Sequence, residues 1–183
     1  MKSSVLIAAV VLSVVVLLGT PALADDAFIG SAENPVDLGW DSQGFNHADG
    51  PEWKGWAYVF VKNTTLDPWG DFHFKIFSYD GSNVSAVDFR DAGMGGFDPI
   101  STQTLSSYTI DNTVVGAEMS LYFYNDPVMP GQVAQFQVWT DNTTTQGNFG
   151  LMIHPSPVPE PSSMLALSGS LLGLAGLAWR RRK

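Results

Sequence analysis

Residues 71–77 read Asp-Phe-His-Phe-Lys-Ile-Phe, and this stretch decides the fold class. Phe72, Phe74 and Ile76 recur at every second position. In an extended chain they share one face, and the histidine and lysine between them share the other. An α-helix would instead need apolar residues three or four positions apart. The stretch therefore predicts a β-strand with one face in a core.

Similar extended, β-branched or aromatic segments occur along the middle of the chain, with Gly, Pro, Asn and Asp between them. No segment between residues 25 and 157 has convincing helical periodicity. Seven or eight short strands at this spacing predict an all-β domain, specifically an antiparallel β-sandwich of the jelly-roll or Ig-like kind, with a barrel as the alternative. The other strand segments are 56–62, 84–90, 104–110, 114–117, 118–125, 132–140 and 147–154.

The expected domain, residues 25–153, is strongly acidic. All 18 acidic residues of the 183-residue chain lie at or after Asp25, whereas the central region has only Lys54, Lys62, Lys75 and Arg90 as bases. Such a surface repels nucleic acid, so we expect no nucleic-acid partner. The chain has no cysteine, which excludes disulfides, thiolate metal sites and cysteine nucleophiles.

The N-terminus predicts an export signal. Lys2 is followed by an apolar run at 5–18, and Ala22-Leu23-Ala24 has the small residues that signal peptidase requires. The run has 14 residues, which is short for a membrane-spanning helix of about 20. We therefore expect residues 1–24 to be a signal peptide, with Ala22 and Ala24 forming the cleavage site and signal peptidase as a partner.

The C-terminus contains three successive elements. Residues 154–163 form a proline-rich spacer that ends in Pro159-Glu160-Pro161 and two serines. An apolar stretch, residues 164–179, would span about 24 Å as a helix, which is a marginal membrane crossing. The chain closes with a basic cluster that the positive-inside rule keeps in the cytoplasm as a stop-transfer signal. This cluster consists of Arg180, Arg181, Arg182 and Lys183. Residues 164–183 thus predict a transmembrane helix with a basic tail.

Together, the Pro159–Pro161 tripeptide, the short Leu/Ala/Gly helix and the terminal arginines resemble the PEP-CTERM sorting signal. The resemblance implies processing by exosortase, a membrane-embedded cysteine protease or transpeptidase that cuts near Pro-Glu-Pro. It also implies a Gram-negative bacterium that makes exopolysaccharide, and a final place on the cell surface or in the extracellular matrix. It says nothing about the central domain.

A sugar site is one hypothesis for the central domain, because tryptophans gather near the long 38–55 segment. Indole faces stack on pyranose rings, although large aromatic residues more often fill a core. The candidates are Trp40, Trp53, Trp56 and Trp69. Calcium is a second hypothesis, since turn carboxylates and amides supply the oxygen ligands that Ca²⁺ prefers. Its candidates are Asp80, Asn83, Asp88 and Asp91.

The sequence favours a protein that is not an enzyme. It contains no Gly-x-Ser-x-Gly motif, and the three histidines, His47, His73 and His154, lack metal-site spacing. A hydrolase with paired carboxylates stays an alternative, because sequence does not give the separation of two carboxyls. The leading hypothesis is an exported surface or matrix protein that supports adhesion, biofilm or exopolysaccharide association without a resident cofactor. The other is a carbohydrate-binding module that uses the four tryptophans.

Overall fold

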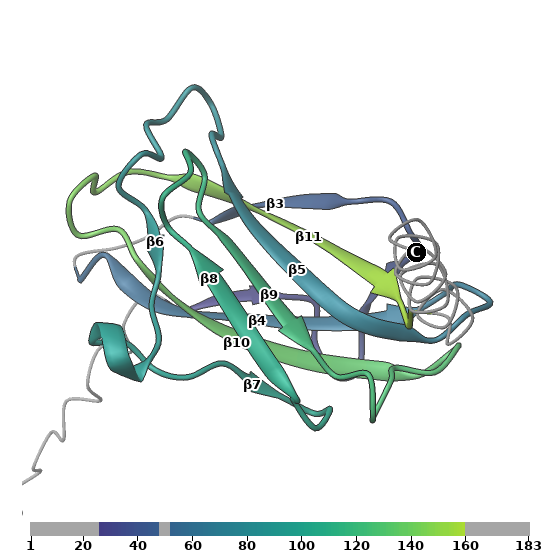
Figure 1. Ribbon diagram of the computed structural model, residues 1–183. Coiled ribbons are helices and arrows are strands. Elements are labelled where there is room, and N and C mark those ends of the chain that lie inside the picture. Colours follow the sequence, from purple (N-terminus) through teal and green to yellow (C-terminus); the bar gives the residue numbers. More distant parts are fainter. Residues whose placement is uncertain (1–25, 48–51, 160–183) are drawn as a thin grey trace, which may run out of the picture.

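The computed structural model of the protein describes residues 26–47 and 52–159 (Figure 1). Within these ranges the chain forms strands and one short 3-10 turn, η1 (Ala92–Met94), so the prediction of an all-β domain is confirmed. The strands are β1 (Ala27–Ile29), β2 (Val36–Leu38), β3 (Gln43–His47), β4 (Lys54–Asn63), β5 (Trp69–Phe77), β6 (Asp88–Phe89), β7 (Ile100–Ser101), β8 (Ser107–Asp111), β9 (Glu118–Tyr122), β10 (Val133–Asp141) and β11 (Phe149–Pro157). The expected signal helix and transmembrane helix lie outside the described residues.

The strands form two sheets that lie one behind the other in Figure 1. The β5–β11 sheet has the order β3-β11-β5-β9-β8 and is antiparallel throughout. The β4–β10 sheet is built on the antiparallel pair of its two long strands. β1 and β2 both pair with the outer edge of β4, and β6 and β7 both pair with the outer edge of β10. Because β1 and β2 run parallel to β4, this sheet is mixed, and the prediction of purely antiparallel pairing is wrong here.

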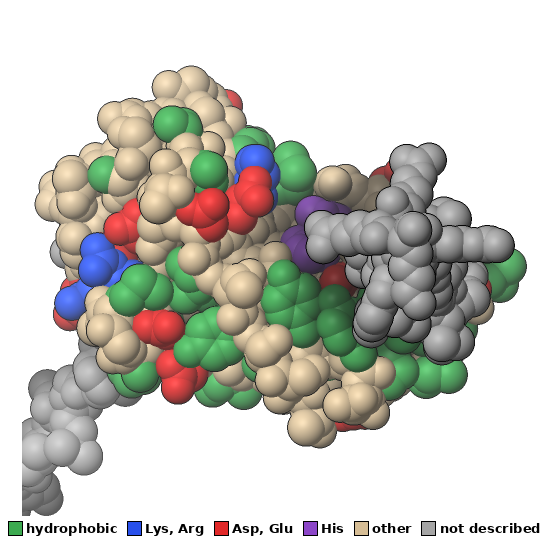
Figure 2. Space-filling view, viewed as in Figure 1, with side chains coloured by type: hydrophobic (Ala, Val, Ile, Leu, Met, Phe, Trp, Pro, Cys, Tyr) green, Lys and Arg blue, Asp and Glu red, His purple; other side chains and the backbone are tan. Residues whose placement is uncertain are grey.

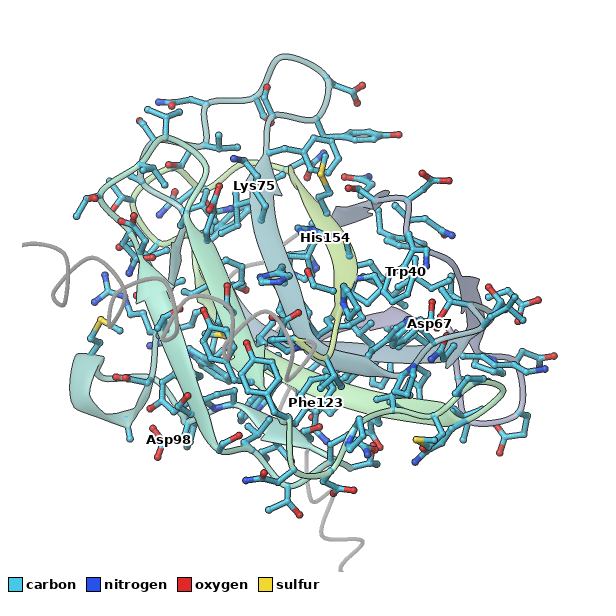
Figure 3. All side chains as sticks on the ribbon, turned by 45° about the vertical axis from the view of Figure 1, so that its right-hand side comes forward. Trp40, Asp67, Lys75, Asp98, Phe123 and His154 are labelled. Atoms are coloured by element: carbon cyan, nitrogen blue, oxygen red, sulfur yellow. The ribbon has the colours of Figure 1, made fainter. Side chains whose placement is uncertain are left out.

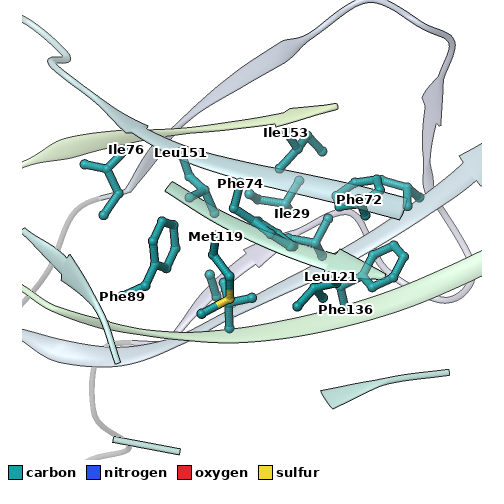
Figure 4. Packing of buried hydrophobic residues seen from close by; sticks show 14 of the residues in the cluster. Ile29, Phe72, Phe74, Ile76, Phe89, Met119, Leu121, Phe136, Leu151 and Ile153 are labelled. Carbon is teal, nitrogen blue, oxygen red and sulfur yellow. The ribbon is translucent and has the colours of Figure 1, made fainter. Parts of the chain in front are cut away.

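The core lies between the two sheets (Figure 4). Phe72, Phe74 and Ile76 of β5 are each at most 1% exposed, which confirms the face predicted from their spacing. Phe136 of β10 comes from the opposite sheet, and its ring stacks on Phe72 with centroids 4.3 Å apart. It also lies 5.7 Å from the ring of Phe123. Aromatic packing of this kind joins the sheets by apolar burial and by ring contacts beyond it.

One predicted strand is wrong and another is mostly not a strand. Of the segment 84–90 only Asp88 and Phe89 pair with β10. The segment 114–117 is a turn, because Asp111 pairs with Glu118 and the residues between them close the β8–β9 hairpin. The short strands β1, β2, β3 and β7 were not predicted. They have five residues or fewer, and each runs along the edge of a longer strand, so their own sequence carries little periodic signal.

The proline-rich spacer begins later than the sequence suggests. Residues 154–157, predicted as spacer, continue β11 and pair with β5, so the folded domain extends past residue 153. β3 begins at Gln43 opposite Ile153, which leaves the last part of β11 with a strand partner on one side only. Prolines are tolerated at such an open edge because their missing N–H deprives no neighbouring strand of a hydrogen bond. On the β5 side, directly after β11, the Val158 N–H donates to the Pro68 carbonyl at 3.3 Å.

Candidate functional site

The outward faces of the two sheets carry different chemistry. On the β5–β11 sheet most outward positions of β5, β9 and β11 are polar, Phe77 and Met152 being apolar, and histidine side chains form a visible group on this face (Figure 2). On the β4–β10 sheet the outward positions of β4 are Lys54, Trp56, Tyr58, Phe60 and Lys62, three of them aromatic. The first face holds a hydrogen-bonded network, and the second holds a row of aromatic rings.

The network on the β5–β11 sheet is organised by His73. Its Nδ1 lies 2.8 Å from Oγ of Ser120, and its Nε2 lies 3.1 Å from both Oδ1 of Asp71 and Oγ of Ser156. Tyr124 donates its hydroxyl to Oδ2 of Asp71 at 3.2 Å. The strands place these groups, since Ser120 of β9 is directly opposite His73 in register. We call these five residues the His73 network.

Electrostatics in this region follow from burial and from Asp71. Burial and then the Asp71 carboxylate raise the pKa of Tyr124 to about 12, so its hydroxyl stays a donor at neutral pH. The ring of His154 stacks on that of His73, with centroids 4.6 Å apart. Burial and then the neighbouring His73 lower the pKa of His154, while Asp71 and Glu118 act in the opposite direction. Lys75, two residues after His73 on β5, makes an ion pair with Glu118.

The His73 network contains the residue types of a Ser-His-Asp triad but lacks the surroundings of one. Ser120 lies within β9, which pairs with β5 on one side and β8 on the other, so backbone N–H groups there serve the sheet. Acyl transfer needs donors aimed at a developing oxyanion near the nucleophile. In the described part of the chain, β9 pairs with a strand on each side of Ser120, so the backbone N–H groups around it are used in strand pairing. We therefore interpret the network as cross-strand stabilisation. The absence of enzyme activity stays a prediction.

The opposite face carries what we call the aromatic face, a continuous set of rings from β1, β4, β10 and the segment 91–99. Phe28 of β1 stacks on Tyr58 of β4 with centroids 4.7 Å apart and planes 5° from parallel. Trp56 lies 6.4 Å from Tyr58, 5.5 Å from Phe97 and 5.4 Å from Trp139. Phe28 is 67% exposed and Phe97 is 52% exposed, whereas Trp139 is only 8% exposed. The outer rings thus face solvent over a buried indole.

The glycine-rich segment 91–99 holds Phe97 in this position. Asp91 caps η1 by accepting the Met94 N–H at 3.0 Å. The Tyr108 hydroxyl of β8 lies 3.2 Å from Asp91 Oδ2 and 3.1 Å from Asp98 Oδ1, which ties both ends of the segment to one anchor. Burial, and then the Asp98 hydrogen bond with the nearby acidic charges, raises the pKa of Tyr108 to about 12. At Gly96 a Cβ would lie 2.7 Å from Cδ1 of Trp139, so only glycine lets the segment approach so closely.

The four predicted tryptophans do not form one site. Trp69 is fully buried in the core, so its place in a sugar site is wrong. Trp40, 41% exposed, follows β2, which pairs with β4 at Asn63, and Figure 3 shows it on the same side as Asp67. Trp53 immediately precedes β4 at its other end. The 10 residues of β4 span about 30 Å, so Trp40 and Trp53 lie at opposite ends of the strand. Of the four, Trp56 alone belongs to the aromatic face.

Sequence reasoning missed Phe28, Tyr58, Phe97 and Trp139 because it looked for tryptophans close together in the chain. The sequence did contain a signal for the β4 rings of the aromatic face. Residues 56, 58 and 60 are Trp, Tyr and Phe at alternate positions, while the residues between them are smaller and apolar. That pattern predicts an aromatic row on the outward face of a strand whose other face is buried. The contributions of β1, β10 and residue 97 depend on strand pairing.

The candidate calcium ligands have local partners. Asn83 Oδ1 accepts from the Ser85 N–H and hydroxyl, and Asp88 forms an ion pair with Arg90. Asp91 caps η1, and Asp80 lies in a turn with φ of 55°. Across residues 26–47 and 52–159 no group of three or more His, Cys, Asp or Glu side chains is arranged to hold a metal ion. Calcium binding stays a prediction from the sequence.

The residues predicted for export and sorting lie almost entirely outside the described ranges. This applies to Ala22 and Ala24 of the cleavage site, to Glu160 and Pro161, and to the basic cluster 180–183. Pro159 is described; it is exposed and follows directly on the Val158 contact with Pro68. In the part of the chain that the structure describes, no helix has the length and apolar character needed to cross a membrane.

Comparison with known proteins finds a match for the tail. Residues 157–183 match the family model of the PEP-CTERM protein-sorting motif, which confirms the resemblance seen in the sequence. No curated protein matches the chain, and no solved structure matches it. The motif supports an exported protein that is sorted by exosortase and anchored in the membrane in transit before it reaches the surface or matrix.

Proposed function

We propose that this chain is a surface or matrix protein of a Gram-negative bacterium, whose β-sandwich supports adhesion and associates with exopolysaccharide in a biofilm without catalysing a reaction. The observation that carries the proposal is the sorting motif at residues 157–183, which begins at the last residue of the last strand of an all-β domain. The arrangement delivers one folded domain to the exterior and offers it to exosortase at its C-terminal end.

The route to the surface uses both termini. Signal peptidase removes residues 1–24 at Ala22-Leu23-Ala24, and the mature chain begins at Asp25. The apolar segment 164–179 then holds the chain in the membrane, with Arg180 to Lys183 in the cytoplasm. Exosortase cuts near Pro159–Pro161 and releases the domain. This order follows from the positions of the two apolar segments and from the family of the tail.

The domain itself is suited to an extracellular matrix. Its central region has 17 acidic residues against 4 basic ones, which keeps it soluble and away from anionic membranes and nucleic acid. Its core of aromatic and aliphatic residues from both sheets stabilises it without disulfides. Its most exposed apolar side chains include rings of the aromatic face, a surface available for contact with another molecule.

Fractionation of a Gram-negative host that has exosortase and produces exopolysaccharide tests this proposal. The tagged full-length chain should appear in the surface or matrix fraction, and its intact mass should show a start at Asp25 and the loss of the sequence after Pro161. Deleting exosortase should leave the tail attached and keep the protein in the membrane fraction. Recovery of an untrimmed chain from the cytosol would contradict export. Unchanged retention in a host unable to make exopolysaccharide would contradict matrix association.

A further inference from the structure

The aromatic face has few charges for an acidic domain; the carboxylate beside it is that of Asp26, whose Oδ1 accepts the Trp56 N–H at 3.0 Å. The outward positions in the middle of β4 and β10 are Trp56, Tyr58, Phe60, Gln135, Gln137 and Trp139, and none of them carries a charge. Charged outward residues occur only at the ends of these two strands, at Lys54, Lys62 and Asp141. The middle of β4 and β10 thus differs from the acidic surface of the rest of the domain. A surface without charged side chains favours a neutral ligand.

Amide groups lie in register beside the rings. Gln137 of β10 is directly opposite Tyr58, and Gln135 is directly opposite Phe60. Both glutamines are half-buried, and in the described part of the chain their side-chain amides make no hydrogen bond. Each amide offers two donors and an acceptor. Burial and then the Asp26 carboxylate raise the pKa of Tyr58, so its hydroxyl also remains a donor and acceptor at neutral pH.

We infer that this face binds a neutral polysaccharide chain of β-linked hexopyranoses, which names the ligand class and the site of the exopolysaccharide association proposed above and rests on that proposal. A β-linked pyranose presents a flat face of C–H groups and a rim of equatorial hydroxyls. The exposed rings of Phe28 and Phe97 receive the C–H faces, which removes apolar surface from water. Gln135, Gln137 and the Tyr58 hydroxyl hydrogen-bond the rim.

The same observations argue against other occupants. An anionic polysaccharide would be repelled by a central region in which acids outnumber bases 17 to 4. An anionic membrane surface is disfavoured for the same reason. A second copy of the chain would bring a second acidic domain against this face, and the repulsion between two central regions of the same net charge opposes that contact. Rings interleaved with free amides are complementary to a ligand that is apolar on its face and polar on its rim.

The test is affinity electrophoresis of the full-length chain in detergent through native gels. The gels contain hydroxyethylcellulose or a soluble β-1,3-glucan as the neutral probe, or alginate as the anionic one. We expect retardation by a neutral glucan and none by alginate. Phe28→Ala combined with Phe97→Ala should weaken the retardation at least ten-fold, since both rings are exposed and little folding energy depends on them. Gln135→Leu with Gln137→Leu should weaken it several-fold.

Tyr79→Ala is the matched control, because Tyr79 is an exposed aromatic residue that lies outside the aromatic face. It should bind like the wild type, and unchanged melting temperatures should show that all variants fold. Failure of both neutral probes to retard the wild type would overturn the inference, and so would retardation by alginate alone. A wild-type dimer that Phe28→Ala and Phe97→Ala convert to monomer would overturn it in favour of self-association. If the Phe28/Phe97 variant were retained normally in the matrix, the aromatic face would not be the polysaccharide site, and the proposed function would stand.

Discussion

His154 shows how one side chain makes the stability of this domain depend on pH. Its ring stacks on His73, and its Nδ1 is buried without a hydrogen-bond partner among the described residues. Burial and then His73 lower the pKa of His154 below its usual 6.5, against weaker opposing effects of Asp71 and Glu118. The folded state therefore binds a proton less readily than the unfolded chain does.

The sign of the resulting pH dependence follows from linkage. Well above pH 6.5 His154 is neutral in both states, so it has almost no effect on stability there. As the pH falls through 6.5 toward the lower folded-state pKa, the unfolded chain gains a proton first, and the free energy of unfolding decreases. For one proton the loss is at most about 1.4 kcal/mol per pH unit. Thermal melts from pH 8 to pH 5 should therefore show a steeper loss for the wild type than for His154→Gln. If the wild type and His154→Gln lost stability equally between pH 8 and pH 5, His154 would not be the source of the pH dependence.

Gly96 is the residue on which the position of the 91–99 segment depends. A Cβ there would lie 2.7 Å from Cδ1 of Trp139 and 2.7 Å from Cβ of Arg90, so Gly96→Ala must displace the segment. We expect it to lower the free energy of unfolding by about 1–3 kcal/mol, the usual cost of overpacking. It should also change tryptophan fluorescence as Phe97 moves away from Trp56 and Trp139. Gly39→Ala is the control, since a Cβ at Gly39 meets nothing within 4 Å. Equal denaturation curves for the two variants would contradict this account.

At the scale of elements, β5 and β10 join the sheets through Phe72 and Phe136. The two rings are fully buried and stacked at 4.3 Å, and the ring of Phe123 also stacks on Phe136 with centroids 5.7 Å apart. Phe136→Ala should lower the free energy of unfolding by about 3–5 kcal/mol, because it removes buried apolar surface and leaves a cavity. Leu66→Ala, at a residue that is 93% exposed, should change it by less than about 0.5 kcal/mol. Urea denaturation of the two variants measures the difference, and similar midpoints would show that Phe136 does not join the sheets.

The elements that sequence predicted well are those with long alternation. β5, β9 and β10 carry apolar residues at every second position, and their buried faces agree with that pattern. The segment 114–117 is β-branched and apolar in part, but it turns, because Gly116 adopts φ of +81° while β8 and β9 pair on either side. A Cβ at Gly116 would lie 2.3 Å from the Ile76 carbonyl oxygen. Local composition favours a strand there, and the hairpin overrides it.

At the scale of the whole molecule, the sorting motif abuts the folded domain. The Val158 N–H makes the last described hydrogen bond to Pro68, and the Pro-Glu-Pro tripeptide begins at the next residue. A protease that needs an extended backbone must therefore work directly beside the β5–β11 sheet. Inserting six Gly and Ser residues between Val158 and Pro159 should raise the rate of C-terminal processing several-fold, since the linker gives the tripeptide freedom from the sheet.

Pulse-chase labelling followed by mass spectrometry measures that rate. The same insertion between Gly81 and Ser82 is the control, because a Cβ at Gly81 meets nothing within 4 Å and that exposed turn is remote in sequence from the motif. It should leave processing unchanged. A linker at Val158 that leaves the rate the same or slows it would show that the sheet does not limit access to the motif.

By itself the sequence determined which faces of the long strands are buried and what the tail is for. Both are local properties: side-chain direction alternates with each residue of a strand, and the sorting motif is one continuous stretch. Tertiary structure alone decided that neighbouring tryptophans separate, and that Phe28, Tyr58, Phe97 and Trp139 meet. The physical reason is that β4 pairs with β10, whose residues lie some 80 positions further along the chain. Which strands pair depends on how the whole core packs, and no short segment contains that information.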